Sequence, residues 1–308
     1  MTVMIFGCGY SGKAIAKTFA ADGFSVSGTV RSPESAEALA AHDIKPLIFD
    51  GSSFGDDLTA ALKDVTHLVQ SIPPTKVKSQ KLSHPASKTP AGDQDGDPLL
   101  KLLSGQLKAI CPKLQWIGYL STVGVYGDHG GGWVTEETPG SPILGRSIER
   151  VDTEEAWAEQ GRAAGVPVAA LRLSGIYGPG RNAFVNLDRG TARRIIKRDQ
   201  VFNRIRVEDI GAATLFLAQR KLDGIYNVTD DEPCPPQDVI VEAARLMGVE
   251  PPPELDFDTA EMTPMARSFY GANKRVSNEK MRALGFEFRF PNYRKSLAQM
   301  WSDDVWRG

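Results

Sequence analysis

The chain has 308 residues, 41% of them hydrophobic and 24% charged, which is enough apolar material for one or two globular domains with a sizeable core. The formal net charge is −2 and the isoelectric point is about 6.1, so we expect neither a nucleic-acid partner nor an anionic membrane partner. No apolar run reaches the length of a membrane-spanning helix, so we also expect no membrane span.

Cysteine and histidine usage argues against two further classes of protein. The cysteines are few and scattered, which fits a reducing cytoplasm rather than a disulfide-stabilised secreted domain, and the chain opens on a strand pattern rather than a signal sequence. The histidines lie far apart and lack paired-ligand spacing, so we expect no metal site. These residues are Cys8, Cys111, Cys234, His42, His67, His84 and His129.

Strand and helix patterns alternate through the first half of the chain. Short apolar runs predict strands at residues 2–6, 24–30, 45–50, 67–72, 116–121 and 166–173. Helical spacing predicts a first helix over 11–21, and Pro33 predicts the start of a second. Alternating strands and helices build βαβ units, so the sequence predicts an α/β protein with a Rossmann-type doubly wound parallel sheet.

The pattern is less regular after about Pro179. We expect short strands at 193–197, 203–207 and 225–228, and helices at 208–219 and 236–247, the second of which ends at Gly248. Ser277 is expected to cap the first of two final helices, which ends at Gly285. The predicted organisation is a dinucleotide-binding domain over 1–178 and a small substrate lobe mainly over 179–308, with 207–228 returning to the first domain.

Residues 73–98 interrupt the alternation. The segment is rich in Lys, Ser, Pro, Asp and Gly and has almost no large apolar side chain, so it can bury little surface and is predicted to be a mobile loop. It follows the fourth strand, and ligands bind at the carboxyl ends of the strands in such sheets. A lid over the site and a plain surface insertion therefore both remain open.

The segment from Gly7 to Gly12, G-C-G-Y-S-G, lies between the first strand and the first helix and matches the dinucleotide-binding pattern G-x-G-x-x-G. Gly7 permits a tight turn, Gly9 lets the backbone approach a pyrophosphate, and Gly12 lets helix and strand pack closely. The helix N-terminus, at Tyr10 and Ser11, offers amide donors and a positive dipole end. We therefore expect these residues to bind the cofactor.

The end of the second strand indicates which dinucleotide binds. An NAD site usually has Asp or Glu there for the ribose hydroxyls. This chain instead has Arg31 and Ser32, a guanidinium and a hydroxyl that suit a 2′-phosphate. We therefore expect NADP in preference to NAD, with a solvated loop role for Arg31 as the alternative. Ser71, at the end of the fourth strand, completes the cofactor contacts expected from the strand ends.

Together with further motifs, the glycine loop resembles that of the extended and atypical short-chain dehydrogenase/reductases, the NAD-dependent epimerase/dehydratase group. The motifs are S-T-V-G-V-Y-G (121–127), R-L-S-G-I-Y-G-P-G-R (172–181) and R-I-R-V-E-D-I (204–210), and K-R-V-S-N-E-K (274–280) is similar to a little-characterised bacterial branch. The resemblance covers nearly the whole chain. It implies the fold, a nicotinamide dinucleotide and an adenine contact for Asp50, for which a strand-end turn cap is the alternative.

In this group a Tyr-x-x-x-Lys pair, on the helix after the fifth strand, works with a Ser or Thr that orients the substrate oxygen. The resemblance gives the hydroxyl role to Thr122, which is also expected at the cofactor, and makes Ser121 the second choice. The Tyr and Lys positions fall on Leu144 and Ile148, and neither of these side chains can carry a proton.

Other side chains are candidates for the missing chemistry and for substrate binding. Tyr126 is a further catalytic candidate and Tyr177 a substrate contact, although the resemblance gives both positions mainly structural roles. Arg146 is placed to hold the ribose or a substrate anion. Arg181 and Arg204 belong to a cluster of basic residues, which predicts an anionic substrate such as a phosphate or carboxylate, with pairing to local acids as the alternative. The cluster consists of Arg172, Arg181, Arg193, Arg194, Arg204 and Arg206.

Two functions therefore remain open. One is an NADP-linked oxidoreductase or epimerase that acts on a small or sugar-like anionic substrate with non-standard acid/base residues, for which the loop carboxylates Asp128, Glu136 and Glu137 are candidates. The other is a catalytically silent NADP(H)-binding protein that senses the cofactor pool or binds a partner. The missing Tyr–Lys pair favours the second, and the phosphate loop with Thr122 favours the first. A monomer and a homodimer are both compatible with the sequence.

Overall fold

The computed structural model describes residues 1–74, 96–143 and 145–308, which form two compact units. The first unit comprises Met1–Ser121, Leu144–Leu171 and Thr214–Ile225, and the second comprises Thr122–Ile143, Arg172–Ala213 and Tyr226–Gly308. The predicted boundary at residue 178 placed 122–143 in the dinucleotide-binding domain. These residues instead group with the second unit, because their backbone pairs with residues 273–277.

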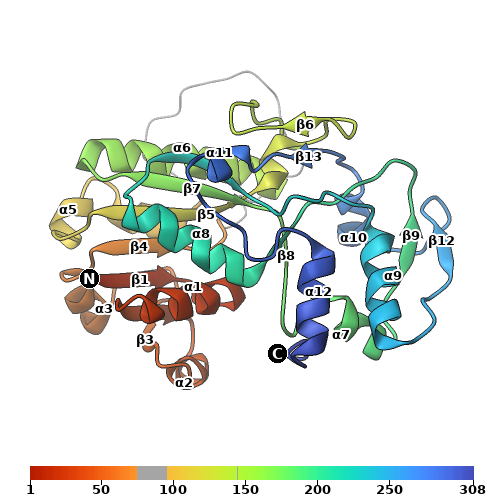
Figure 1. Ribbon diagram of the computed structural model, residues 1–308. Coiled ribbons are helices and arrows are strands. Elements are labelled where there is room, and N and C mark those ends of the chain that lie inside the picture. Colours follow the sequence, from red (N-terminus) through yellow and green to blue (C-terminus); the bar gives the residue numbers. More distant parts are fainter. Residues whose placement is uncertain (75–95, 144) are drawn as a thin grey trace. The chain divides into compact units, whose positions relative to one another are not determined.

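A seven-stranded sheet has the strand order β11-β7-β5-β4-β1-β2-β3 (Figure 1). The pairs β1–β2, β2–β3, β1–β4 and β4–β5 are parallel. The order reverses between β1 and β4, which is the point where doubly wound sheets bind ligands. The predicted Rossmann-type sheet is therefore confirmed. Its strands are β1 (Thr2–Phe6), β2 (Ser25–Val30), β3 (Lys45–Ile48), β4 (His67–Gln70), β5 (Trp116–Thr122), β7 (Val168–Leu173) and β11 (Gly224–Val228).

Helices connect these strands, and the predicted helices at 11–21 and 208–219 are found with their starts one residue earlier. The helices are α1 (Tyr10–Ala21), α2 (Pro33–Ala40), α3 (Asp56–Leu62), α4 (Pro98–Leu103), α5 (Leu107–Ile110), α6 (Gly145–Ala164) and α8 (Val207–Gln219). A short 3-10 helix, η1 (Val123–Tyr126), follows β5 directly. Ser32 begins α2 as its N-cap, which explains why Pro33 predicts that start.

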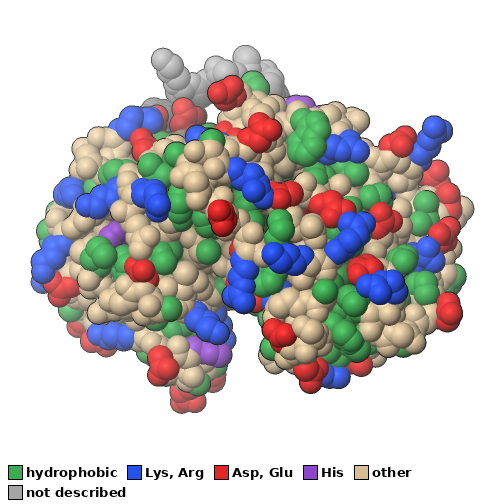
Figure 2. Space-filling model, in the orientation of Figure 1, with side chains coloured by type: hydrophobic (Ala, Val, Ile, Leu, Met, Phe, Trp, Pro, Cys, Tyr) green, Lys and Arg blue, Asp and Glu red, His purple; other side chains and the backbone are tan. Residues whose placement is uncertain are grey.

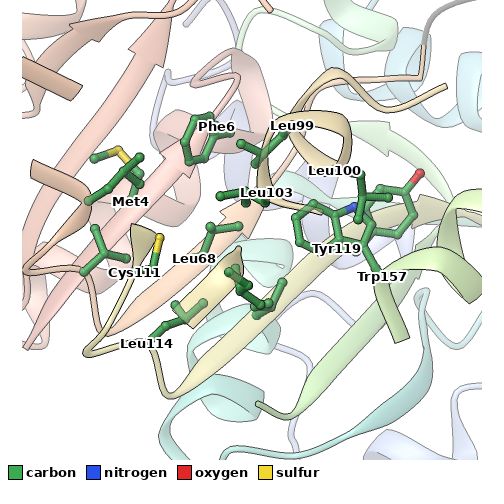
Figure 3. Packing of buried hydrophobic residues seen from close by; sticks show 14 of the residues in the cluster. Met4, Phe6, Leu68, Leu99, Leu100, Leu103, Cys111, Leu114, Tyr119 and Trp157 are labelled. Atoms are coloured by element: carbon green, nitrogen blue, oxygen red, sulfur yellow. The ribbon is translucent and has the colours of Figure 1, made fainter. Parts of the chain in front are cut away.

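The hydrophobic core of the first unit brings together side chains of β1, β4 and β5 with those of α4 and α6 (Figure 3). Phe6, Tyr119 and Trp157 are almost completely buried there, and so are Leu99 and Leu103 of α4. Removing one such side chain from water contributes about 1.5–3 kcal/mol to folding. This packing holds α4 and α6 against the sheet.

A buried carboxylate, Asp97, ties three elements of this core together. Gln70 Nε2 donates to its two oxygens at 2.7 and 2.8 Å, and Trp157 Nε1 donates to Oδ2 at 2.9 Å. The amides of Leu99 and Leu100, in the first turn of α4, donate to Oδ1. Desolvation raises the pKa of this carboxyl group, and the hydrogen bonds oppose that shift. The end of β4, the start of α4 and the middle of α6 therefore meet at one side chain.

Two predicted boundaries need correction. Of the predicted loop over 73–98, residues 75–95 lie outside the described part of the chain, but at its end Asp97 is buried and caps α4. Ser277 was expected to be an N-cap, whereas Asn278 holds that position for α11 (Glu279–Ala283). Ser277 Oγ accepts a hydrogen bond from the Glu279 amide at 3.2 Å, one residue outside the cap.

The second unit contains three two-stranded parallel sheets, β8–β10, β9–β12 and β6–β13. The predicted helix at 236–247 is present, and Gly248 ends it in the left-handed conformation at φ 69°. Its elements are β6 (Trp133–Val134), β8 (Gly175–Tyr177), α7 (Ala183–Asp188), β9 (Arg194–Ile196), β10 (Arg204–Arg206), α9 (Pro236–Met247), β12 (Glu254–Asp256), α10 (Pro264–Phe269), β13 (Arg275–Val276), α11 and α12 (Tyr293–Ser302).

The segment 272–278 joins parts of this unit that are far apart in the sequence. The Asn273 carbonyl accepts from the His129 amide at 2.9 Å, and the Asn273 side-chain amide donates to the Asp199 carbonyl at 2.8 Å. Lys274 Nζ donates to the Gly127 carbonyl at 2.8 Å. The segment therefore holds the glycine-rich loop after η1 in place.

The visible face of the space-filling view (Figure 2) carries charges of both signs. On the face shown in Figure 2, basic and acidic side chains are interspersed. Among the residues that the structure describes, no helix is long and apolar enough to cross a membrane.

Asp97→Asn should lower the free energy of unfolding by about 2–3 kcal/mol, because a side-chain NH₂ would replace an acceptor and face the donors of Gln70 and Trp157. Urea denaturation would measure this change. Asp50→Asn is the matched control, since Asp50 is exposed and its Oδ1 accepts from Ser52, a bond that Asn can keep. Equal stabilities of the two variants would contradict the role given to Asp97.

Candidate functional site

The glycine loop has the geometry of a phosphate-binding turn. Gly7 has φ 78°, and a Cβ there would lie 2.8 Å from Ile72 Cγ1. A Cβ on Gly12 would lie 3.2 Å from the Gly7 carbonyl oxygen, whereas one on Gly9 would meet nothing within 4 Å. Gly7 and Gly12 therefore have no room for a side chain, because other protein atoms lie against them. Gly9 faces open space, from which a ligand can approach.

The N-terminus of α1 is open in the same way. Gly9 is its N-cap residue, and no side chain caps it in the described part of the chain. Tyr10 and Ser11 form the first turn and are partly exposed. Backbone amides at such an end attract an oxyanion, and the helix dipole adds to the attraction.

The end of β2 lies against this loop. A Cβ on Gly28 would come within 2.8 Å of Cys8 Cβ, so only glycine leaves room for the Cys8 side chain. Burial raises the pKa of the Cys8 thiol to about 11, which makes it a packing residue rather than a nucleophile. Arg31 follows β2 and is exposed, and within the described residues no carboxylate pairs with it. Ser32 Oγ donates to Ser35 Oγ at 3.1 Å.

Two other predicted cofactor residues lie at the ends of β3 and β4. The Asp50 carboxylate accepts from the Ser52 hydroxyl at 2.7 Å and from the Ser52 amide at 2.8 Å, and the hydroxyl is the larger cause of its lowered pKa. This geometry is that of the turn cap considered as the alternative for Asp50. Ser71 is partly exposed, and its amide donates to the Phe6 carbonyl at 2.9 Å beside the glycine loop.

The two hydroxyls at the end of β5 differ in their surroundings. Ser121 is buried, and its Oγ donates a hydrogen bond to Glu154 on α6. Thr122 is partly exposed, and its Oγ1 accepts from the Gly124 amide at 3.1 Å as the N-cap of η1. Its hydroxyl hydrogen has no acceptor among the described residues. Of the two hydroxyl groups, only that of Thr122 keeps a hydrogen that is not already donated within the described residues.

Helix α6 belongs to the first unit and begins at Gly145, within the stretch where the Tyr–Lys pair was expected. Leu144 lies outside the described residues, and Ile148 is 38% exposed. Arg146 lies in the first turn and is exposed. One turn later, Arg150 Nη1 donates to the Leu120 carbonyl of β5.

The two candidate tyrosines belong to the core of the second unit. Tyr126 is completely buried, and its hydroxyl donates to Asn227 Oδ1 at 2.7 Å. Tyr177 is 8% exposed and packs among Phe184, Tyr293 and other aromatic residues. Desolvation raises the pKa of both phenols, so neither is poised to ionise near neutral pH. These surroundings favour the structural roles that the resemblance implies.

The loop carboxylates are also engaged. The Asp128 Oδ1 accepts from the Asn273 amide at 2.7 Å, which is the main cause of its lowered pKa. Glu136 Oε1 accepts from the Asn227 amide at 2.8 Å. Glu137 is exposed. Asp128 and Glu136 therefore shape the loop.

The basic cluster separates into structural and candidate arginines. Arg206 is buried and bound by both Glu208 oxygens at 2.6 and 2.7 Å, and Arg194 pairs with Glu254 at 2.7 Å. The alternative interpretation, that the basic residues pair with nearby acids, is therefore confirmed for Arg206 and Arg194. Arg204 Nη1 donates to the Phe202 carbonyl at 3.1 Å and to Cys234 Sγ at 3.0 Å, and it has no acidic partner within hydrogen-bond reach among the described residues. Arg181 is exposed in a tight turn before α7.

Three polar residues that matter here were not singled out from the sequence. Asp97 had a signal, because Asp before Pro is a typical helix start. Glu154 had none, since its partner Ser121 is 33 residues away in sequence. Lys274 belongs to the quoted K-R-V-S-N-E-K motif, but nothing local indicated that it would be buried. Desolvation lowers its pKa to about 8.

Comparisons with known proteins agree with this architecture. No protein-family model matches the chain. Protein YeeZ of Escherichia coli strain K12 is 30% identical over 298 residues, which cover 94% of this chain and 96% of that protein. A functionally unknown conserved protein from Silicibacter pomeroyi DSS is 42% identical, with a TM-score of 0.82 over 98% of this chain and 99% of that chain.

More distant solved structures share the fold. The UDP-glucose 4-epimerase of Thermus thermophilus, solved with NAD, has a TM-score of 0.75 at 19% identity and covers 100% of this chain and 99% of its own. The predicted resemblance to the epimerase/dehydratase group is therefore confirmed at the level of fold.

Lys274→Met should change stability in a pH-dependent way. The pKa of Lys274 is lowered to about 8 from 10.5, so the folded state binds fewer protons than the unfolded state in that window. The cost of burying the ammonium is therefore full below about pH 8 and fades as the pH rises toward the unfolded value. Relative to the Met variant, the wild type should gain on the order of 2–3 kcal/mol of unfolding free energy between about pH 7 and about pH 10.

Denaturant unfolding at several pH values would measure this difference. Lys295→Met, at an exposed position of α12, is the matched control and should show no such dependence. Parallel pH curves for the two variants would show that burial of Lys274 carries no cost.

Proposed function

The chain belongs to the family of Protein YeeZ, and on that premise we propose that it binds NADP(H) and acts as an oxidoreductase or epimerase on a small or sugar-like anionic substrate. The proposal also places the protein in the cytoplasm, in keeping with three free buried cysteines, and as a monomer or homodimer.

The observation that carries the proposal is the glycine loop at the switch point of the sheet. Gly7 and Gly12 are closed against Ile72 and the Gly7 carbonyl, while Gly9 faces open space beside the uncapped start of α1. A pyrophosphate fits such a turn, because backbone amides and the helix dipole replace its hydration. Gly7, Gly9, Tyr10, Ser11 and Gly12 are the residues that would hold it.

Arg31 supports NADP rather than NAD. Its guanidinium is exposed at the end of β2 with no carboxylate partner among the described residues, and Ser32 and Ser35 add hydroxyls at the start of α2. A 2′-phosphate is a doubly charged acceptor that such a set binds well. Asp50 has both of its close hydrogen bonds within its own turn, with Ser52. Ser71 would complete the contacts on the other side of the loop.

The chemistry would divide between cofactor and protein. A bound nicotinamide supplies or accepts a hydride, and Thr122 would donate a hydrogen bond to the substrate oxygen and orient it. Arg146, Arg181 and Arg204 are the side chains proposed to attract a substrate phosphate or carboxylate, and Tyr177 is a further proposed substrate contact. Only electrostatic binding is asked of the arginines, since they stay charged at all relevant pH values.

A catalytically silent NADP(H)-binding protein is the second candidate. Three observations favour it. Ile148 is aliphatic, and Tyr126 and Tyr177 are buried with raised pKa values. Such a protein would respond to the cofactor pool or bind a partner, and would show no turnover with any substrate.

Arg31→Ala should weaken NADPH binding by about tenfold or more and change NADH binding by less than about twofold, because only NADPH carries the 2′-phosphate. Titration followed by nicotinamide fluorescence would measure both constants. Arg162→Ala, at an exposed position near the end of α6, is the control for loss of a positive charge. Equal losses for NADPH and NADH would remove the argument for NADP.

Thr122→Ala should abolish any turnover found in a screen of anionic carbonyl compounds while NADPH affinity changes by less than about threefold. Thr122→Ser is the matched variant, since it keeps both the hydroxyl and the cap of η1, and it should retain activity. NADPH oxidation would measure turnover. If Thr122→Ala weakens NADPH binding and the wild type turns over nothing, the silent-protein candidate is favoured.

A further inference from the structure

A buried carboxyl group, that of Asp230, neighbours Arg204 in the second unit. The Asp230 amide donates to the Arg204 carbonyl at 2.8 Å, so the two backbones are in direct contact. Asp230 is 1% exposed, and its Oδ1 accepts from the Glu232 amide at 3.3 Å. Its Oδ2 is buried and has no hydrogen-bond partner among the described residues. This oxygen therefore lacks the protein contact that usually offsets the cost of burying a polar atom.

The Arg204 guanidinium is held by neutral groups and does not close onto this carboxyl group. Its Nη1 donates to the Phe202 carbonyl at 3.1 Å, to the Cys234 carbonyl at 3.4 Å and to Cys234 Sγ at 3.0 Å. The described residues provide no hydrogen-bond acceptor for Nε or Nη2 of Arg204. The side chain is partly exposed, so a ligand can approach it from solvent.

A second buried donor lies on the same face of the β8–β10 sheet. In this parallel pair Gly175 is opposite Arg204, and Tyr177 is opposite Arg206. Side chains two positions apart on a strand point to one face, so Tyr177 and Arg204 share it. The Tyr177 hydroxyl is buried without a hydrogen bond to the described residues, and the nearby Ser296 Oγ accepts from Arg206 Nη1 at 2.9 Å. Desolvation raises the pKa of this phenol, which therefore stays protonated and able to donate.

The surroundings of Asp230 favour its neutral form. Desolvation raises the pKa of this carboxyl group well above its usual value, and the Arg204 charge opposes the shift. The negative charges of Asp231 and Glu232 raise the pKa further, and burial keeps the neighbouring Cys234 thiol neutral by raising its pKa to about 11. A neutral carboxyl group carries an O–H, so Asp230 becomes a third donor beside the guanidinium and the phenol.

We infer that Arg204, Tyr177 and the protonated carboxyl group of Asp230 form an oxyanion subsite, which takes the phosphate or carboxylate group of the substrate. The three side chains offer N–H and O–H donors for which the described residues supply too few acceptors, and an oxyanion supplies them. The inference rests on the proposed function for the substrate itself. It adds Asp230 as the residue that makes anion binding depend on pH.

The direction of this dependence follows from the charge of Asp230. Ionisation would remove the O–H donor and place a negative charge beside the ligand, so the anion is bound while the carboxyl group is protonated and is released as it ionises. By reciprocity, a bound anion must stabilise the protonated form. A preference of about tenfold for that form raises the pKa of Asp230 by about one.

Carbon NMR on isotope-labelled protein would measure this linkage between about pH 5 and about pH 9, with sulfate as the probe because its charge is constant over that range. The Cγ signal of Asp230, identified by its loss in Asp230→Asn, reports ionisation. The Cζ signal of Arg204, identified by its loss in Arg204→Gln, reports binding. Saturating sulfate should raise the pH at which Asp230 ionises by about one or more. Acetate in parallel shows whether the subsite prefers a carboxylate to a tetrahedral oxyanion.

The variants separate the neutral carboxyl group from its charge. Below the pH of ionisation, calorimetric titration should give Asp230→Asn a sulfate affinity within about threefold of the wild type, because the amide keeps a donor. Arg204→Gln should lose about tenfold or more under the same conditions. Asp188→Asn, at an exposed position of α7, is the control for net charge and should behave as the wild type does. Circular dichroism would check that each variant is folded.

The outcomes distinguish this subsite from the proposed function. An Asp230 that is ionised throughout the range, an ionisation that sulfate leaves unchanged or lowers, or full sulfate affinity in folded Arg204→Gln would overturn the subsite. If the sulfate effects are found but the wild type binds neither NADPH nor NADH, the subsite stands and the proposed function fails. If NADPH binds and the sulfate effects are missing, the dinucleotide proposal stands and the subsite is wrong.

Discussion

The buried carboxylate of Asp97 is the contact on which the first unit depends. It receives hydrogen bonds from the end of β4, from the first turn of α4 and from the middle of α6. Burying a carboxyl group costs folding free energy unless its oxygens accept hydrogen bonds. The oxygens of Asp97 accept hydrogen bonds from all three elements. Any arrangement that moved α6 along the sheet would remove the Trp157 donor from Asp97, so this polar contact favours one position of the helix.

That position of α6 decides how the end of β5 is used. Glu154 accepts a hydrogen bond from the Ser121 hydroxyl, and Arg150 donates one to the Leu120 carbonyl. These groups therefore hold α6 against β5. Thr122 is the next residue, and the alternation of side chains along a strand turns it to the other face. The hydroxyls of Ser121 and Thr122, which look equivalent in the sequence, therefore make different contacts. One closes the contact between helix and strand, and the other is left partly exposed at the ligand-binding edge of the sheet.

In the second unit, polar side chains also join segments that are far apart in the sequence. Asn273 and Lys274 hold the loop that follows η1, and Arg206 is bound on all sides by Glu208, Ser296 and Gln299. A cluster of basic residues in the sequence is thus partly an internal scaffold. Arg146 and Arg181, in contrast, are exposed, and Arg204 donates to the Phe202 carbonyl and to Cys234.

The sequence by itself determined the sheet, the glycine loop and the order of the elements, because these depend on local signals: apolar runs of strand length, helical spacing, and glycines where φ is positive or space is short. It also determined that Tyr and Lys are missing at the usual spacing. Only the tertiary structure decided which side of α6 faces β5, which hydroxyl can donate to a ligand, and that Asp97 and Lys274 are buried. Those properties arise from contacts between residues tens of positions apart, such as Ser121 with Glu154, and no local pattern encodes the angle at which a helix meets a strand.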